Sequence, residues 1–249
     1  MEKRYFLYLK FKGTKYHGWQ IQPNGISVQE EVEQAIAILL QKKIALTAAG
    51  RTDAGVHASC MVAHFEHDKN IVRDKFMFHL NNILSESISI YDLKEVTLDF
   101  HARFAAKSRT YRYSISADKN PFQEEITHRY SKKIELEKMN EAARLMLGER
   151  DFSCFSKSKT QTFTNNCDLQ KAEWFEKDGT YIFEIRANRF LRNMVRAIVG
   201  TLLEVGEGKR TLESIPVLID SKDRSNAGVS VPAKGLFLVD IEYPGEGFI

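Results

Sequence analysis

The chain has 249 residues, 43% of them hydrophobic, which is enough to bury one large core or two modest ones and indicates one or two domains. Its 36 Lys and Arg against 33 Asp and Glu give a formal net charge of only +3, so global charge would not attract a polyanion and a nucleic-acid site must concentrate its basic residues locally. The 3 cysteines are odd in number and form no C-x-x-C pair, which argues against a disulfide framework or a zinc knuckle and favours a reducing, cytoplasmic setting.

The first predicted element is a strand. Residues 4–11 alternate in a period of two, as a strand with one strongly buried face does, and a loop follows over 13–25. Ser27 and Glu30 form the S-x-x-E pattern of a capping box, and the apolar residues after it recur at helical spacing, which predicts a helix over 27–41. We see neither a signal-peptide region nor an apolar run of about 20 residues, so we expect no targeting or membrane-spanning segment.

The later elements give the two halves of the chain similar inventories. The predicted ranges are, in chain order, strands at 44–48 and 60–65, a helix at 73–84, strands at 87–96 and 108–114, a helix at 137–147, strands at 169–175 and 181–187, a helix at 190–205 and a closing strand at 236–243.

Strands that come in adjacent pairs, rather than in strict β-α-β alternation, are typical of the α+β class. No repeat strong enough to prove duplication and no Pro/Gly/Ser-rich linker is present. We therefore predict two similar β-α-β-β-type halves, 1–105 and 106–249, that share a continuous mixed, mainly antiparallel sheet with helices on one face.

The segment from Ala49 to Ala58 holds the most reactive candidate. It reads A-G-R-T-D-A-G-V-H-A and interrupts two β-like runs, and its two glycines permit turns that place side chains at the edge of a sheet. Its carboxylate, Asp53, is suited to be a nucleophile, a base or a turn-stabilising Asx residue. The pattern alone leaves these three readings open.

The run from Gly50 to Ala58 resembles, without mismatch, the G-R-T-D-A-G-V-H-A signature of the TruA family of tRNA pseudouridine synthases. The resemblance covers essentially the whole chain and includes K-S-R-T-Y-R-Y at 107–113, Asp151-Phe152 with Phe155, Leu191 with M-V-R at 194–196, and P-A-K-G-L at 232–236. It implies a pseudouridine synthase fold with the active-site cleft between the halves. It also implies a cofactor-free isomerase that acts as a homodimer and converts uridine to pseudouridine at positions 38, 39 and 40 in the anticodon stem-loop of tRNA.

The resemblance assigns roles to three residues. Asp53 matches the aspartate that attacks or deprotonates the ribose side of a flipped uridine, and breaking and remaking a glycosidic bond does require a carboxylate near the sugar. Tyr111 matches the residue that stacks on the target uracil and is a candidate for removing its C5 proton. Without that match, a tyrosine on a strand is more often part of the core packing. Arg196 matches the arginine that pairs with the aspartate and favours its ionised form.

Neighbouring polar residues are assigned from their positions. Arg109 shares the predicted strand face of Tyr111, beside which it places a cationic group. Arg51, two residues before the aspartate, is placed to contact a phosphate or to fill the gap left by a flipped nucleotide. We expect His57 to hydrogen-bond the loop. The other histidines show no ligand spacing, so we expect no metal site.

A further group of arginines lies near the M-V-R motif. Arg189, Arg192 and Arg196 fall at i, i+3 and i+7, which predicts one helical face suited to phosphates or to the catalytic carboxylate, with solvated helix arginines as the alternative. The chain departs from the family pattern here, at Arg192-Asn193, and also at Glu149-Arg150, where a histidine is common.

Two rival functions fit parts of the pattern. Paired β-α-β-β halves with aromatics on strands also describe a non-catalytic tandem RRM-like RNA-binding protein, but the RRM aromatic run is not found. A hydrolase with Asp53 as nucleophile requires a metal cluster, a phosphate-cradling Gly-rich loop or a second carboxylate, and none has an evident candidate. The intact aspartate signature therefore favours the RNA isomerase.

Overall fold

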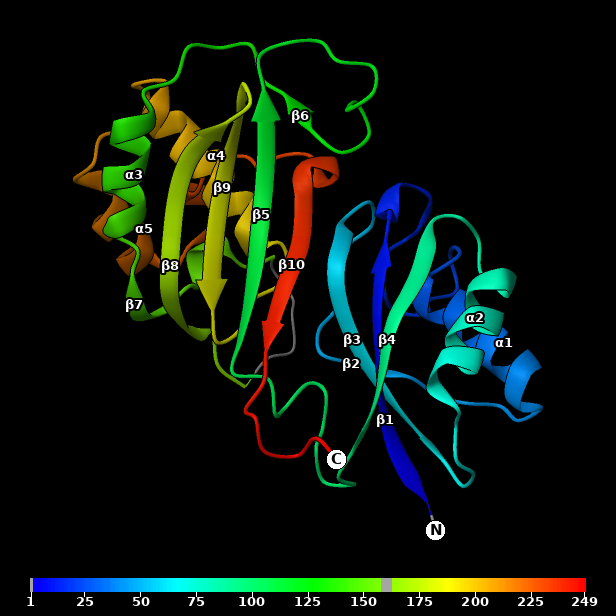
Figure 1. Cartoon of the computed structure of the whole chain (residues 1–249). Coiled ribbons are helices and arrows are strands. Elements are labelled where there is room, and N and C mark those ends of the chain that lie inside the picture. The colour runs from blue at the N-terminus through cyan, green and yellow to red at the C-terminus, as the bar shows by residue number, and fades with distance from the viewer. Residues whose placement is uncertain (1, 158–162) are drawn as a thin grey trace. The chain divides into compact units, whose positions relative to one another are not determined.

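The computed structural model describes residues 2–157 and 163–249, which Figure 1 colours along the chain. The chain forms two compact units, the first made of residues 1–107 with 238–249 and the second of residues 108–237. The C-terminal residues 238–249 thus belong to the first unit.

The first unit is built on an antiparallel sheet in which β1 (Lys3–Phe11) lies between β4 (Ile88–Val96) and β3 (His57–His67). The short strand β2 (Thr47–Ala48) extends it by pairing with β3. β1 is buried on both faces, because Leu7 and Leu9 on one face and Phe6 on the other are all fully buried. The alternation in the sequence indicated one buried face, and the rings of Phe100, Tyr243 and Phe248 cover the second one at Phe6.

Two helices complete the first unit, α1 (Val28–Leu40) and α2 (Arg73–Ile83), which lie side by side in Figure 1. The predicted cap of the first helix is confirmed, because the Ser27 side chain accepts a hydrogen bond of 3.2 Å from the Glu30 backbone N–H. Gln41 ends that helix in the left-handed conformation, with φ of 51°.

In the second unit, antiparallel strands lie in the order β5 (Ser108–Ser116), β9 (Thr180–Ala187), β8 (Asn166–Lys177) and β7 (Gly148–Asp151). The two-residue strand β6 (His128–Arg129) pairs in parallel with β5. The last strand of the chain, β10 (Leu236–Glu242), spans the boundary between the two units.

The core helix of the second unit is α4 (Met194–Gly206). Every one of its residues except Arg196 and Glu204 is buried, as expected of a helix that is apolar on all sides. It packs against α3 (Leu136–Arg144), and α5 (Ser214–Ser221) completes the helical layer. The remaining helical turns are 3-10 helices, namely η1 (Gly13–Lys15), η2 (Ser153–Phe155), η3 (Arg224–Asn226) and η4 (Ala233–Gly235).

The α+β class with mixed, mainly antiparallel strands is confirmed, and three predicted elements are corrected. The helix expected at 190–205 begins only at Met194, the one expected at 137–147 ends at Arg144, and the strand expected at 44–48 covers only its last two residues. The sequence reading missed α5 because Pro216 interrupts its pattern, although proline is tolerated in the first helical turn.

No helix in residues 2–157 and 163–249 is long and apolar enough to cross a bilayer.

The side chain of Asn140 connects α3 to the sheet of the second unit. Its Nδ2 donates to the Trp174 carbonyl over 2.9 Å and its Oδ1 accepts from the Trp174 N–H over 2.7 Å. These two bonds satisfy strand groups that the shorter β7, which pairs only near the start of β8, does not reach.

We predict that Asn140→Ala lowers the free energy of unfolding by about 2 kcal/mol, because it leaves a backbone donor and acceptor on β8 without these partners. Asn82→Ala, at an exposed position of α2, is the control and should change it by less than about 0.5 kcal/mol. Urea denaturation of both variants measures the difference. Equal effects would show that this side chain does not hold α3 to the sheet.

Candidate active site

Asp53 lies in the loop between β2 and β3, in the first unit. The Val56 N–H donates to the Asp53 carbonyl over 3.1 Å, and Gly55 adopts φ of 77°, so the chain makes a tight turn directly after the carboxylate. Thr52 is buried, whereas Asp53 is half-buried and Arg51 is exposed. The loop thus anchors its threonine in the core and leaves the two charged side chains, Arg51 and Asp53, partly or fully accessible.

This loop is held by a second stretch of backbone, residues 13–19, which we call the clamp segment. The Trp19 N–H donates to the Thr52 carbonyl and the Gly55 N–H donates to the Tyr16 carbonyl, each over 3.2 Å. These two bonds flank Asp53 on its two sides. The backbone that carries the carboxylate is therefore fixed by hydrogen bonds from outside its own loop.

Two glycines of the clamp segment allow the backbones to lie this close. A Cβ on Gly13 would collide with the Val56 carbonyl oxygen, and one on Gly18 with the Thr52 carbonyl oxygen. Gly18 also has φ of 94°, which side chains rarely adopt. Both positions are restricted to glycine by contact with the aspartate loop.

His57 closes the same arrangement. It is fully buried, and its Nδ1 accepts a hydrogen bond of 3.0 Å from the Gly13 N–H. This contact agrees with the expectation that the histidine of the signature hydrogen-bonds a loop, and the loop is the clamp segment.

Tyr16 ties the clamp segment to the helical layer of the first unit. Its hydroxyl donates to Glu31 Oε2 over 2.6 Å and lies 3.0 Å from Ser85 Oγ, while the Ser85 N–H donates to Glu31 Oε1 over 2.9 Å. Burial, together with the hydrogen bond to Glu31, raises the pKa of Tyr16 to about 12. Burial opposes ionisation of Glu31, but the bonds from Tyr16 and Ser85 still lower its pKa. The pair is thus a neutral donor and an ionised acceptor at neutral pH.

In the second unit, β5 carries Arg109 and Tyr111, both half-buried. The Tyr111 ring meets Phe190 edge to face, with centroids 5.2 Å apart, and Arg109 Nη1 donates to the Asn188 carbonyl over 2.8 Å. The strand therefore offers a partly accessible tyrosine beside a cation that is oriented by a backbone carbonyl.

Arg196 and Tyr113 hold the segment that contains the P-A-K-G-L motif. Arg196 Nε donates to the Val231 carbonyl over 2.7 Å, and the Val231 N–H donates back to the Arg196 carbonyl over 3.2 Å. The Tyr113 hydroxyl donates to the Pro232 carbonyl over 2.8 Å, and a Cβ on Gly235 would meet the Tyr113 ring. The stretches 107–113, 194–196 and 232–236, which resemble the family, thus contact one another or their immediate neighbours within this unit. Arg196 is hydrogen-bonded to the backbone there.

The expected row of arginines on one helical face is wrong. α4 begins at Met194, and Asn193 before it has φ of 66°, in the left-handed region. Arg189 and Arg192 therefore lie in the irregular segment ahead of the helix, and only Arg196 is helical. The i, i+3, i+7 spacing does not describe their arrangement because the helix starts four residues later than predicted.

The structure thus places Arg51 and Asp53 in one loop of the first unit, and Arg109, Tyr111, Arg192 and Arg196 in the second unit. From the sequence, the clamp segment was predicted only as part of a loop, and its contacts with the aspartate loop were not predicted. The signal was its two glycines with aromatic residues between and after them. Among the described residues, no group of three His, Cys, Asp or Glu side chains is arranged to hold a metal ion.

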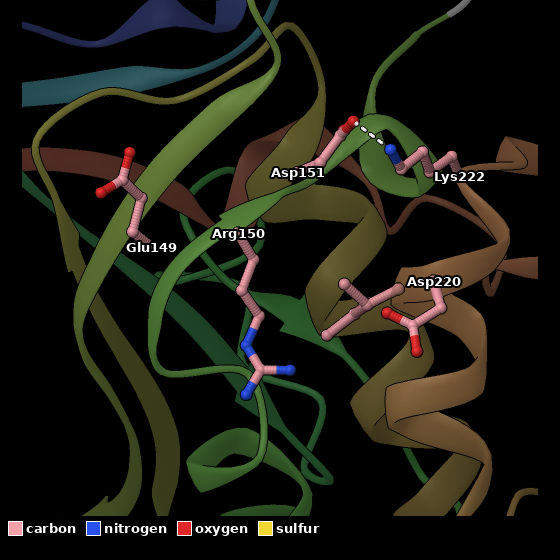
Figure 2. Close-up of a pocket in the computed structure, with 6 residues that line it drawn as sticks. Glu149, Arg150, Asp151, Asp220 and Lys222 are labelled. Carbon is pink, nitrogen blue, oxygen red and sulfur yellow. Dashed lines mark ion pairs between the residues drawn. The ribbon is translucent and has the colours of Figure 1, made fainter.

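A cavity of about 410 Å³ lies elsewhere in the second unit, between β7 and α5, as Figure 2 shows. It is lined by Glu149, Arg150, Asp151, Ile219, Asp220 and Lys222. Asp151 and Lys222 form an ion pair of 3.2 Å. Acidic groups outnumber basic ones in this lining and it includes none of the predicted site residues, so it is poorly suited to a polyanion.

Comparison with known proteins gives consistent matches. Residues 142–244 match the family model of tRNA pseudouridine synthases. The chain is 47% identical to tRNA pseudouridine synthase A of Parabacteroides distasonis, over 99% of this chain and 98% of that protein. It is 49% identical to the protein of that name from Bacteroides thetaiotaomicron, over 99% and 93%, and 42% identical to the one from Buchnera aphidicola, over 97% and 92%.

We predict that Gly18→Ala lowers the free energy of unfolding by about 2 kcal/mol or more, since it combines a collision with the Thr52 carbonyl and a strained φ. Hydrogen exchange should also show faster exchange of the Trp19 amide, whose acceptor is that carbonyl. Gly50→Ala is the matched control, because a Cβ there meets nothing within 4 Å. If the two variants were equally stable, the close backbone approach would not constrain the loop.

Proposed function

The chain belongs to the tRNA pseudouridine synthase A family, and on that premise we propose that it isomerises uridine to pseudouridine in the anticodon stem-loop of tRNA with Asp53 as its catalytic carboxylate. Two observations support the proposal. The chain is 47% and 49% identical to two tRNA pseudouridine synthases A over 99% of its length, and its Gly50–Ala58 signature is uninterrupted. The family resemblance gives positions 38, 39 and 40 as the target uridines.

The reaction defines what the site must do. The bond from C1′ of the ribose to N1 of uracil breaks, the base turns, and a bond from C1′ to C5 forms, while a proton leaves C5 and N1 gains one. A carboxylate near the sugar assists either by attacking it or by removing a proton. A half-buried Asp53, on a backbone fixed by the clamp segment, is suited to hold one orientation through these steps.

The other predicted site residues take supporting roles in the proposal. Tyr111 stacks on the target uracil, and its partial exposure on β5 is compatible with that role. Arg196 takes the role of the family arginine that pairs with the catalytic aspartate. Arg109 and Arg192 contact the RNA backbone, and Arg51 contacts a phosphate or fills the gap left by the flipped nucleotide. The roles of Tyr111 and Arg196 rest on the family resemblance, whereas those of Arg51, Arg109 and Arg192 rest on their positions in the chain.

The rival readings find no support in the comparisons. A non-catalytic tandem RRM-like protein would not share nearly half of its residues, over its whole length, with named pseudouridine synthases. The same relatives argue against a hydrolase in which Asp53 is the nucleophile, because they are named as pseudouridine synthases.

We also propose that the enzyme acts as a homodimer in the cytoplasm. A chain of this size has a radius of gyration of about 18 Å, small beside an L-shaped tRNA, and a net charge of +3 provides little basic surface on one subunit. A two-fold dimer combines the arginines of both chains in one groove.

Asp53→Asn preserves size but removes the charge, so pseudouridine formation should fall by about a thousandfold or more while tRNA affinity stays within a few-fold. A single-turnover assay, together with a tRNA titration, measures both. Asp74→Asn, whose side chain is 85% exposed, should leave the rate unchanged. Near-normal turnover by Asp53→Asn would remove this residue from the mechanism.

Tyr111→Phe retains the stacking area and loses the hydroxyl, so binding should survive while turnover falls about a hundredfold if that oxygen handles the C5 proton. Tyr111→Ala should weaken binding as well. Tyr181→Phe, on the neighbouring strand β9, is the control for removal of a tyrosine hydroxyl. If both Tyr111 variants turned over at the original rate, Tyr111 would be reassigned to core packing.

The dimer proposal predicts that size exclusion with light scattering gives twice the mass of one chain, and that activity per chain falls at concentrations where the dimer dissociates. Binding of tRNA should weaken steeply as salt is raised, since Lys and Arg contacts to phosphates release counterions. A fully active monomer would contradict the proposal.

A further inference from the structure

Residues 100–105 form a turn that is fixed to the core of the first unit. Ala102 is fully buried, its N–H donates to His64 Nδ1 over 3.1 Å, and its carbonyl accepts a bond of 2.6 Å from the Tyr243 hydroxyl. Phe100 is also buried and stacks on Phe6, with centroids 5.2 Å apart. The first half of the turn therefore has little freedom to move.

The second half of this turn presents an aromatic ring to solvent. Phe104 is 76% exposed, although Ala102, two residues before it, is fully buried. The His101 ring lies 4.4 Å from it and the Arg103 guanidinium carbon 5.7 Å from its centroid. The ring is thus accessible, oriented by a neighbouring imidazole and accompanied by a permanent positive charge.

His101 is itself held in place. Its Nδ1 accepts the N–H groups of Arg103 and Phe104, over 3.0 and 3.3 Å, and its carbonyl accepts the Ala105 N–H over 2.9 Å. Burial, followed by the charge of Arg4, lowers its pKa, so the imidazole is neutral at neutral pH. These bonds orient Phe104 without a covering layer of protein.

Phe122 in the second unit shows what an ordinary exposed phenylalanine looks like. It is 94% exposed, and in the described part of the chain no aromatic ring or cation is recorded against it. Isolated exposed apolar residues of that kind are normal and require no explanation. Phe104 differs because a rigid backbone, a second ring and a guanidinium all converge on it.

We propose that Phe104 and Arg103 form a docking platform for the RNA substrate, on which an unpaired base stacks while the guanidinium meets an adjacent phosphate. This inference rests on the proposed function, because it takes tRNA as the bound polyanion. Stacking on a protein aromatic ring accepts any base, since every base has a π-face, and a neighbouring arginine adds to it. One ring with one cation matches a single nucleotide, whereas a protein partner requires a far larger apolar surface.

The test compares tRNA affinity among exchanges at exposed positions. Phe104→Ala should raise the Kd for tRNA about tenfold. Phe104→Trp, which keeps an aromatic ring, should have the Kd of the original protein, and so should Phe122→Ala. Arg103→Gln should weaken binding and reduce the slope of log Kd against log salt by about one phosphate contact. Thermal melts of each variant establish that all of them are folded.

An unchanged Kd for Phe104→Ala would overturn the proposal. So would a shift from dimer to monomer in Phe104→Ala without RNA, because the ring would then belong to a contact between two copies of the chain. The Kd is read from binding alone, so the outcome is separate from that of the proposed function. Loss of affinity in a protein that forms no pseudouridine would retain the platform and reject the catalytic assignment.

Discussion

The close approach of two loop backbones in the first unit is the constraint on which the candidate site depends. The clamp segment donates to the Thr52 carbonyl and accepts from the Gly55 N–H, so the residues on both sides of Asp53 are fixed. Glycine at position 18 is required for that approach, and the Tyr16 hydroxyl carries the restraint on to the helical layer. A carboxylate held in this way has less conformational entropy to lose when substrate binds, which is how positioning contributes to catalysis.

The second unit organises its polar residues around a helix that is otherwise buried. Arg196 is one of the two residues of α4 that are not buried, and it exchanges hydrogen bonds with Val231. Tyr113 secures the next residue of the same segment. A substitution at Arg196 therefore disturbs the packing of this segment as well as any contact of the guanidinium with substrate or carboxylate, and its effects on stability and on turnover have to be measured separately.

Local patterns predicted the local structure well. The Ser27 cap, the alternation in β1 and the helical spacing of α1 all have short-range causes, and the structure confirms those elements. The patterns did not predict the local structure where it is determined by contacts between residues far apart in the sequence. Asn193 adopts a left-handed conformation, and its Nδ2 donates a hydrogen bond of 2.6 Å to Ser230 Oγ. Because of this conformation, α4 starts later than the apolar spacing indicates. The clamp segment was not predicted for the same reason, since its hydrogen bonds to the aspartate loop and to His57 join residues more than thirty positions apart.

Whether this chain makes pseudouridine in the anticodon arm of tRNA can be measured in tRNA from a strain that lacks the gene. Pseudouridine should be missing there at positions 38 to 40, the sites that the family resemblance gives, and should return when the gene is restored. Pseudouridine that persists at these sites in the deletion strain, or fails to return on restoration, would show that another enzyme modifies them.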